Sequence, residues 1–277
     1  MRAAPSSPPV PRSARDLVLG PVVLAATANV IMELSWPGVG HGVAESRVDS
    51  GNVMLHPVHR FRTTSAYLAV ALLGTDDERL AYRRAVGRSH AHVHATAESP
   101  VDYDAFDPEL QRWVALCLYR AFEDTWGLLA GHPGMRLPDA VYRDCATLGT
   151  TLQMRPEQWP PDRDAFDGAW DDGLAHVRID DVVRAYFARL LRGDFLPEPV
   201  RRASAASRTF WTTGFLHEPF RSLLGLEWSR ADQQRFEARG RRLGMLVRRL
   251  PTPLRRAPYS TALADLRVRR ALGRPLV

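Results

Sequence analysis

The sequence predicts an all-α protein, built as a single globular multi-helix domain. Apolar residues recur at the 3.6-residue spacing of a helix, and almost no stretch alternates with the period of two that strands show. The chain has 277 residues, 45% of them apolar and 25% charged, which is enough to bury one large core. We expect a disordered tail over 1–14, the helical domain over 15–250 and a basic C-terminal extension over 251–277.

Start and stop signals place the individual helices along the chain. Trp36 before Pro37 ends the first helix, Thr75 and Glu78 form a capping box, and Asp107 caps a helix that begins with proline. In chain order, we expect helices over 21–34, 39–44, 58–73, 76–94, 108 to between 127 and 131, 137–149, 164–177, 180–191, 197–207, 212–224, 229–250 and 260–272.

The charge pattern limits the classes of partner. All 37 positive side chains are arginine and the net charge is +6. Arginine pairs well with carboxylates and phosphates, although solvated helix faces explain most of such a count. No helix-turn-helix or aromatic RNA-binding motif accompanies the charge, so we expect no nucleic-acid partner. Cys117 and Cys145 form no CxxC pair, which excludes a zinc ribbon or a dithiol redox motif.

The uncharged stretch 17–32 raises the question of a membrane. Its 16 residues fall short of the roughly 20 that a spanning helix needs, so we interpret it as a buried core helix. No convincing secretory signal is present, and we expect a cytoplasmic protein. The alternative is peripheral membrane association through this stretch and the basic C-terminal segment. The oligomeric state is left open.

Three histidines lie near the end of the helix expected over 76–94. His90 and His94 are four residues apart and share a face of that helix, whereas His92 points elsewhere. Imidazoles at this spacing can bind a transition metal, and a single histidine can hold haem iron. The HExxH signature of zinc proteases is absent. For His92 and His94, exposed polar positions are the better interpretation.

A cation, a hydroxyl and a carboxylate precede these histidines. Arg60 and Thr64 are one helical turn apart and can present their polar groups to the same space. Glu45 follows an apolar turn that contains Gly42, where desolvation is expected to raise its pKa and make it a usable base. From spacing alone, all three also fit solvated surface positions.

The ordered set of motifs resembles the MpaB and rubber-oxygenase (latex-clearing protein) family. The motifs are Trp-Pro-Gly-Val-Gly-His-Gly-Val-Ala-Glu-Ser at 36–46, Arg-x-x-x-Thr at 60–64, Val-Gly-Arg-Ser-His-Ala-His-Val at 86–93, Tyr-x-x-x-Asp-Pro-Glu-Leu-x-x-Trp-Val at 103–114, and Gly-Phe-Leu-x-x-x-Phe-Arg-x-x-Leu-Gly-Leu-x-Trp at 214–228. The resemblance covers roughly residues 16–250. It implies the all-helical core of that family, whose studied members bind haem b.

The resemblance also implies roles for single residues. His90 matches the proximal haem ligand, with His94 as the alternative if the register shifts by one turn. Arg60 and Thr64 match residues of the distal side, and Glu45 matches the glutamate that acts as the base in polyisoprene cleavage. The implied activity is a haem-b-dependent oxygenase acting on a hydrophobic, lipid- or isoprenoid-like small molecule. The alternative is a helical protein that binds haem or lipid without turnover.

Two positions depart from the family pattern. Thr63 stands where rubber oxygenases have a lysine that can ligate iron on the distal side, so we expect that side to be open or bound by water. Trp36 stands where many relatives have histidine. Rubber oxygenases are secreted and this chain shows no signal, so polyisoprene is not the expected substrate.

Overall fold

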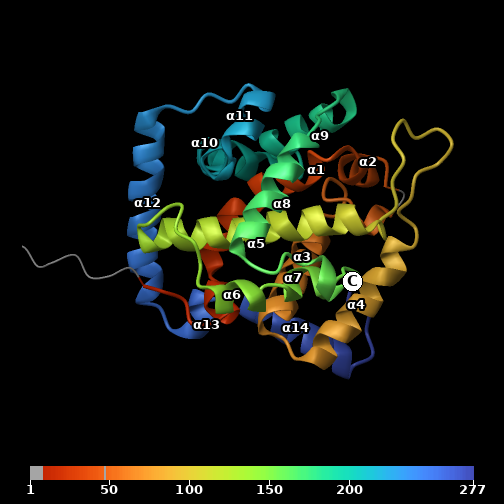
Figure 1. Cartoon of the computed structure of the whole chain (residues 1–277), viewed down its shortest axis with the longest axis horizontal. Helices are drawn as coiled ribbons and strands as arrows, with labels where there is room; N and C mark the ends of the chain where they lie inside the picture. The colour runs from red at the N-terminus through yellow and green to blue at the C-terminus, as the bar shows by residue number, and fades with distance from the viewer. Residues whose placement is uncertain (1–8, 47) are drawn as a thin grey trace, which may run out of the picture.

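Every regular element of the described chain is a helix, which confirms the predicted fold class (Figure 1). A computed structural model describes residues 9–46 and 48–277. The α-helices are α1 (Ala26–Leu34), α2 (Pro37–Ala44), α3 (Pro57–Leu73), α4 (Asp76–His90), α5 (Pro108–Ala130), α6 (Asp139–Asp144), α7 (Thr147–Thr150), α8 (Arg163–Ala175), α9 (Asp181–Arg192), α10 (Glu198–Phe215), α11 (Glu218–Leu224), α12 (Arg230–Arg248), α13 (Thr252–Arg255) and α14 (Tyr259–Ala271). Short 3₁₀ segments are η1 (Ala14–Leu17), η2 (Gly20–Ala25), η3 (Asp49–Gly51) and η4 (Pro156–Gln158).

Helix α5 runs through the middle of the molecule, with α12 crossing one end (Figure 1). The carboxylate of Asp107 caps its start by accepting from two backbone amides, and Gly131 ends it in the left-handed conformation at φ 81°. Trp113 is buried on α5 and stacks on Trp36 with ring centroids 5.0 Å apart. The indole of Trp36 also donates to the carbonyl oxygen of Gly173 at 2.9 Å, so Trp36 joins α2, α5 and α8.

The end of α4 differs from the prediction. The helix stops at His90 instead of continuing to 94, and the chain turns into a loop over 91–107. Backbone hydrogen bonds join Ala95 to Tyr103 at 2.7 Å and Ala105 to Val93 at 2.9 Å, so the two sides of this loop pair with each other. The expectation that His94 shares a helix face with His90 is therefore wrong.

A second difference concerns the helices predicted over 197–207 and 212–224. Helix α10 is continuous through 208–211, and the break falls at Leu216 and His217. The apolar side chains of Phe210 and Trp211 pack partly buried against the core, and no proline or glycine interrupts the chain there. The stop is instead set by the turn before Pro219, which lies in the first turn of α11.

The stretch 17–32 lies largely in the core, as predicted: Leu17 and Ile31 are almost completely buried. Across residues 9–46 and 48–277, no single helix is long and apolar enough to cross a membrane; only the bent pair Gly20–Leu34 and Pro37–Ala44 passes that test together. At the other end of the chain, α14 packs against α3, and the C-terminus lies beside α4 (Figure 1).

Candidate functional site

His90 is the last residue of α4 and is partly buried. Its Nδ1 lies 2.8 Å from the Oε1 of Gln153, and its ring meets the edge of Phe106 with centroids 6.3 Å apart. No residue in the described part of the chain bonds to Nε2. Burial lowers the pKa of His90, and the positive charge of Arg60 lowers it further, so the ring is neutral at physiological pH.

The side chain of Gln153 fixes which nitrogen of His90 carries the proton. Its Nε2 donates weakly to the carbonyl oxygen of Arg83, and its Oε1 also accepts from Gln111, each at 3.4 Å. Gln111 is itself held by the carbonyl oxygen of Ala105 at 2.7 Å. An acceptor at Nδ1 requires the proton there and leaves the lone pair on Nε2, which is the tautomer of a histidine that binds a metal through Nε2.

Arg60 lies on the first turn of α3, is exposed, and makes no ion pair with any described residue. Its positive charge nevertheless lowers the pKa values of Glu33, His90 and Tyr186, in each case as a smaller effect than burial. These three residues come from α1, α4 and α9. The charge of Arg60 thus acts on groups from three other helices, and we call Arg60, Glu33, His90 and Tyr186 the Arg60 region.

That region is open to water. Burial dominates the pKa values of Glu33, His90 and Tyr186, yet all three residues remain partly accessible. Thr64, one turn beyond Arg60 on α3, is also partly accessible, whereas Thr63 is buried and its hydroxyl donates to the carbonyl oxygen of Arg60 at 3.1 Å.

Glu33 is the residue of this region that the sequence did not single out. Burial raises its pKa from 4.5 to about 8, despite the charge of Arg60 and a hydrogen bond from the amide of Asn29. A carboxyl group that titrates near neutral pH in an accessible interior is suited to proton transfer. Its position hid it, because Glu33 directly follows the apolar stretch 17–32 and marks only the end of a hydrophobic run in the sequence.

Glu45 lies in a different polar cluster at the end of α2. One carboxylate oxygen bonds to His41 Nδ1, and the other accepts from Ser99 at 2.9 Å and Tyr103 at 3.3 Å. The second nitrogen of the fully buried His41 lies 2.6 Å from Asp180, which caps α9. The hydrogen bonds that His41 and Glu45 make stay within this cluster.

The expected raised pKa of Glu45 is wrong. Burial alone would raise it, but the hydrogen bonds from His41, Ser99 and Tyr103 and the charge of His41 together lower it. The same contacts raise the pKa of His41 against its burial. The two carboxylates therefore favour the protonated form of His41, and their contacts tie α2 to α9.

His92 and His94 lie in the loop after α4 and are exposed. His94 Nδ1 contacts only the carbonyl oxygen of the next residue, Ala95, at 3.1 Å. Neither joins His90, so the interpretation of both as exposed polar residues holds. Within residues 9–46 and 48–277, no three His, Cys, Asp or Glu side chains are grouped to hold a metal ion. A haem iron needs only one protein ligand, because the porphyrin supplies four.

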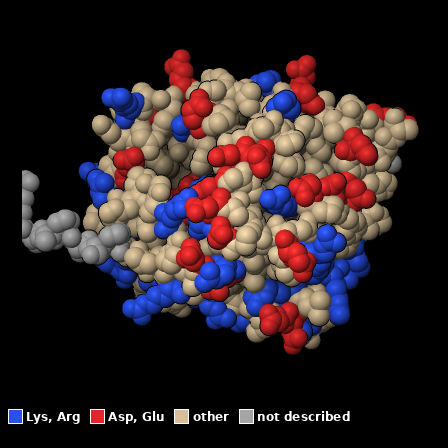
Figure 2. All heavy atoms as spheres, in the orientation of Figure 1, with Lys and Arg blue, Asp and Glu red and all other residues tan. Residues whose placement is uncertain are grey.

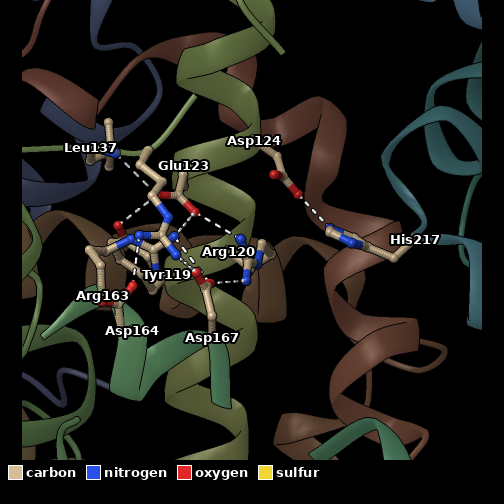
Figure 3. Close-up of polar contacts among 10 residues, drawn as sticks. Tyr119, Arg120, Glu123, Asp124, Leu137, Arg163, Asp164, Asp167 and His217 are labelled. Atoms are coloured by element: carbon tan, nitrogen blue, oxygen red, sulfur yellow. Dashed lines mark hydrogen bonds and ion pairs between the residues drawn. The ribbon is translucent and has the colours of Figure 1, made fainter. Parts of the chain in front are cut away.

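A second buried polar cluster joins α5 to α8 (Figure 3). Glu123 accepts from Arg120 at 2.9 Å and from Arg163 at 3.1 Å, and Asp167 contacts the same two arginines. Burial raises the pKa of Glu123 although both arginines and the hydroxyl of Tyr119 oppose it. Glu123 is 3% exposed and Arg163 5%, so no substrate reaches this cluster and its role is structural.

Comparison with known proteins places the chain in a family. The family model described as "ER-bound oxygenase mpaB/B'/Rubber oxygenase, catalytic domain" matches residues 15–249. Two mycobacterial proteins, Uncharacterized protein Mb2261 of Mycobacterium bovis and Uncharacterized protein Rv2237 of Mycobacterium tuberculosis, are each 48% identical over 255 residues, which is 92% of this chain and all of the relative. No solved structure matches. With its all-helical fold, the chain belongs to the mpaB and rubber-oxygenase catalytic-domain family.

Proposed function

We propose that this protein is a haem-b-dependent oxygenase-like enzyme that acts on a hydrophobic, lipid- or isoprenoid-like small molecule. The observation that carries the proposal is the state of His90: a neutral ring whose Nδ1 bonds to Gln153 and whose Nε2 has no hydrogen-bond partner among the described residues. Membership of an oxygenase family supports the class of reaction.

The residues of the site fit a haem group. His90 would hold the iron through Nε2, and Gln153 would keep the ring in the required tautomer. The guanidinium of Arg60, which has no ion-pair partner in the described chain, suits a propionate or a polar group on the distal side. The bound haem would supply the redox chemistry and the reaction with dioxygen. Thr63 offers no distal ligand, because it is buried and its hydroxyl bonds to its own helix.

Acid–base roles fall to two carboxyl groups in different settings. Glu45 is the base that the resemblance implies; its lowered pKa keeps it ionised but also makes it a weaker proton acceptor than an ordinary glutamate. Glu33 is protonated below about pH 8 and can act as a proton donor. The side chains of Leu55, Val58 and Phe61 are exposed and flank Arg60 in the sequence, which supports the proposal that the substrate is apolar.

The visible spectrum of the purified protein tests the haem assignment. After expression with haem supplied, we expect a Soret band, and we expect His90→Ala to lose it because the iron loses its only protein ligand. His92→Ala is the matched control, since His92 is exposed and lies two residues away. A wild-type protein without a Soret band, or His90→Ala with unchanged haem content, contradicts the proposal.

Gln153 refines the same experiment. Gln153→Leu removes the acceptor at Nδ1, and we expect haem affinity to fall by about 10- to 100-fold, as for other groups that orient metal-binding histidines. Gln153→Glu keeps an acceptor and should restore affinity. If the leucine variant binds haem as tightly as the wild type, Gln153 does not orient the ligand, whatever the result for His90.

The second candidate is a carrier that binds haem or lipid without turnover. It is favoured by the absence of a distal lysine at Thr63 and by the separation of Glu45 from the Arg60 region. Oxygen consumption in the presence of an isoprenoid or fatty-acyl compound separates the two, since only an enzyme sustains it.

A further inference from the structure

The C-terminal half of α12 carries an exposed face that mixes arginine with large apolar side chains. Arg242, Met245, Leu246 and Arg249 follow each other at the spacing of one helix face, and all four are exposed. Leu246 is 60% exposed, and Leu250 and Leu254 continue the apolar surface beyond the helix at 43% and 62%. We call these six residues the α12–α13 surface.

The α12–α13 surface faces away from the core. The opposite side of α12 presents Gly240, Gly244 and Val247, which are buried where the helix crosses α5. The outer apolar side chains therefore cover no other element of the described chain. Large side chains that contact water on an otherwise anchored helix are typical of an interaction site.

The chain segment that carries this surface has charges of one sign. Between residues 238 and 264 the sequence has seven arginines and no aspartate or glutamate. None of these seven arginines forms an ion pair with the described residues: Arg239, Arg241, Arg242, Arg248, Arg249, Arg255 and Arg256. Figure 2 shows arginine side chains along the lower left margin, where α12 and α13 lie.

Unpaired arginines around protruding leucines match the chemistry of an anionic bilayer. Apolar side chains of an interfacial helix insert between lipid headgroups, and the flanking cations pair with phosphate and carboxylate groups. Nucleic acid satisfies the arginines but leaves Leu246, Leu250 and Leu254 without an apolar partner. The stretch 17–32 is not the contact, because its large apolar residues are mostly buried.

We propose that the α12–α13 surface docks the protein on membranes that contain anionic lipid. The docking is peripheral: the leucines enter the interface and the arginines bind headgroups. This assignment does not depend on the haem proposal, since the surface and the Arg60 region share no residue.

Co-sedimentation with vesicles tests the docking. The full-length protein should pellet with phosphatidylcholine vesicles that contain phosphatidylserine, less so at high salt, and not with phosphatidylcholine alone. Arg242→Gln with Arg249→Gln should weaken binding by about 30-fold, because each arginine near an anionic surface contributes about fivefold. Leu246→Gln with Leu254→Gln should also release the protein.

Matched control variants replace arginine and apolar side chains at exposed positions outside the α12–α13 surface. Arg84→Gln with Arg202→Gln makes the same change in charge, and Val200→Gln with Leu223→Gln removes exposed apolar groups outside the surface. Both control pairs should bind vesicles as the wild type does. Equal loss in test and control pairs overturns the proposal. Tighter binding to duplex DNA than to the vesicles, or self-association through Leu246 and Leu254 without vesicles, overturns it as well.

Discussion

At the scale of single residues, Glu33 is a carboxylic acid that stays protonated inside the protein at neutral pH. Burial is the main cause, and the nearby charge of Arg60 only partly offsets it. The pKa of Glu33 is 4.5 in its ordinary state and about 8 in the fold, so between these values the folded protein binds one more proton than the unfolded chain does. The free energy of unfolding must therefore fall as pH rises through this window.

The variant Glu33→Gln removes this pH dependence. From about pH 5 to 8, we expect the unfolding free energy of the wild type to fall by on the order of a few kcal/mol because of Glu33. The variant should lack this decline. Denaturant titrations of both proteins across this range measure the difference curve, which also cancels the contribution of His41. If the unfolding free energies of the two proteins change with pH in parallel, Glu33 does not have the raised pKa that the structure indicates.

The sequence singled out Arg60 and His90 through the order of its motifs, and their role at a haem remains a prediction. In the structure the charge of Arg60 lowers the pKa of His90. Gln153 could not be found, because a glutamine 63 residues away carries no local signal for its contact with His90. The pKa of Glu45 was missed because its main partner, His41, lies one helical turn earlier and was not considered, and because Ser99 and Tyr103 come from a separate loop.

At the scale of elements, the crossing of α12 over α5 depends on two glycines. A Cβ at Gly240 would overlap the side chain of Leu128, and one at Gly244 would overlap the carbonyl group of Leu129, whose carbon lies 2.7 Å from that position. A side chain can move aside, but the backbone of α5 cannot without breaking its own hydrogen bonds. Gly244 therefore sets the closest approach of the two helices.

The substitution Gly244→Ala should destabilise the protein by about 1–3 kcal/mol, because the helices must separate to admit one methyl group. Gly168→Ala is the matched control: Gly168 lies within α8, is exposed, and has open space around its Cβ position. That change should instead stabilise by about 0.5–1 kcal/mol through helix propensity alone. Urea unfolding of both variants checks the sign of each effect, and a stabilised Gly244→Ala contradicts the crossing described here.

Helix boundaries were predictable where local chemistry decides them. The caps at Thr75, Asp107 and Ser229 start their helices as expected. The end of α4 was not predictable, because pairing between the two sides of the 91–107 loop stops the helix, and no residue near His90 signals that pairing. Long-range contact, not propensity, set this boundary.

At the scale of the whole molecule, the fold continues past the part that the family model matches. The match ends at residue 249, but α14 lies on α3 and buries Tyr259, Leu263 and Leu266. Arg267 also pairs at 2.7 Å with Glu78, the residue that completes the capping box of α4. The buried middle of α3, which follows Arg60 and Thr64, is therefore covered by the C-terminal segment.

A charge placed on the inner face of α14 should accordingly weaken the whole protein. Leu266 is 1% exposed, and Leu266→Asp should lower the free energy of unfolding by at least about 3 kcal/mol, because a carboxylate replaces a packed side chain beside α3. Val268 lies on the same helix but is 57% exposed, so Val268→Asp should change stability by less than about 0.5 kcal/mol. Thermal unfolding followed by circular dichroism compares the two. If Leu266→Asp unfolds like the wild type, α14 is an appendage; if it unfolds early and also loses haem, the C-terminal segment supports the helix that carries Arg60.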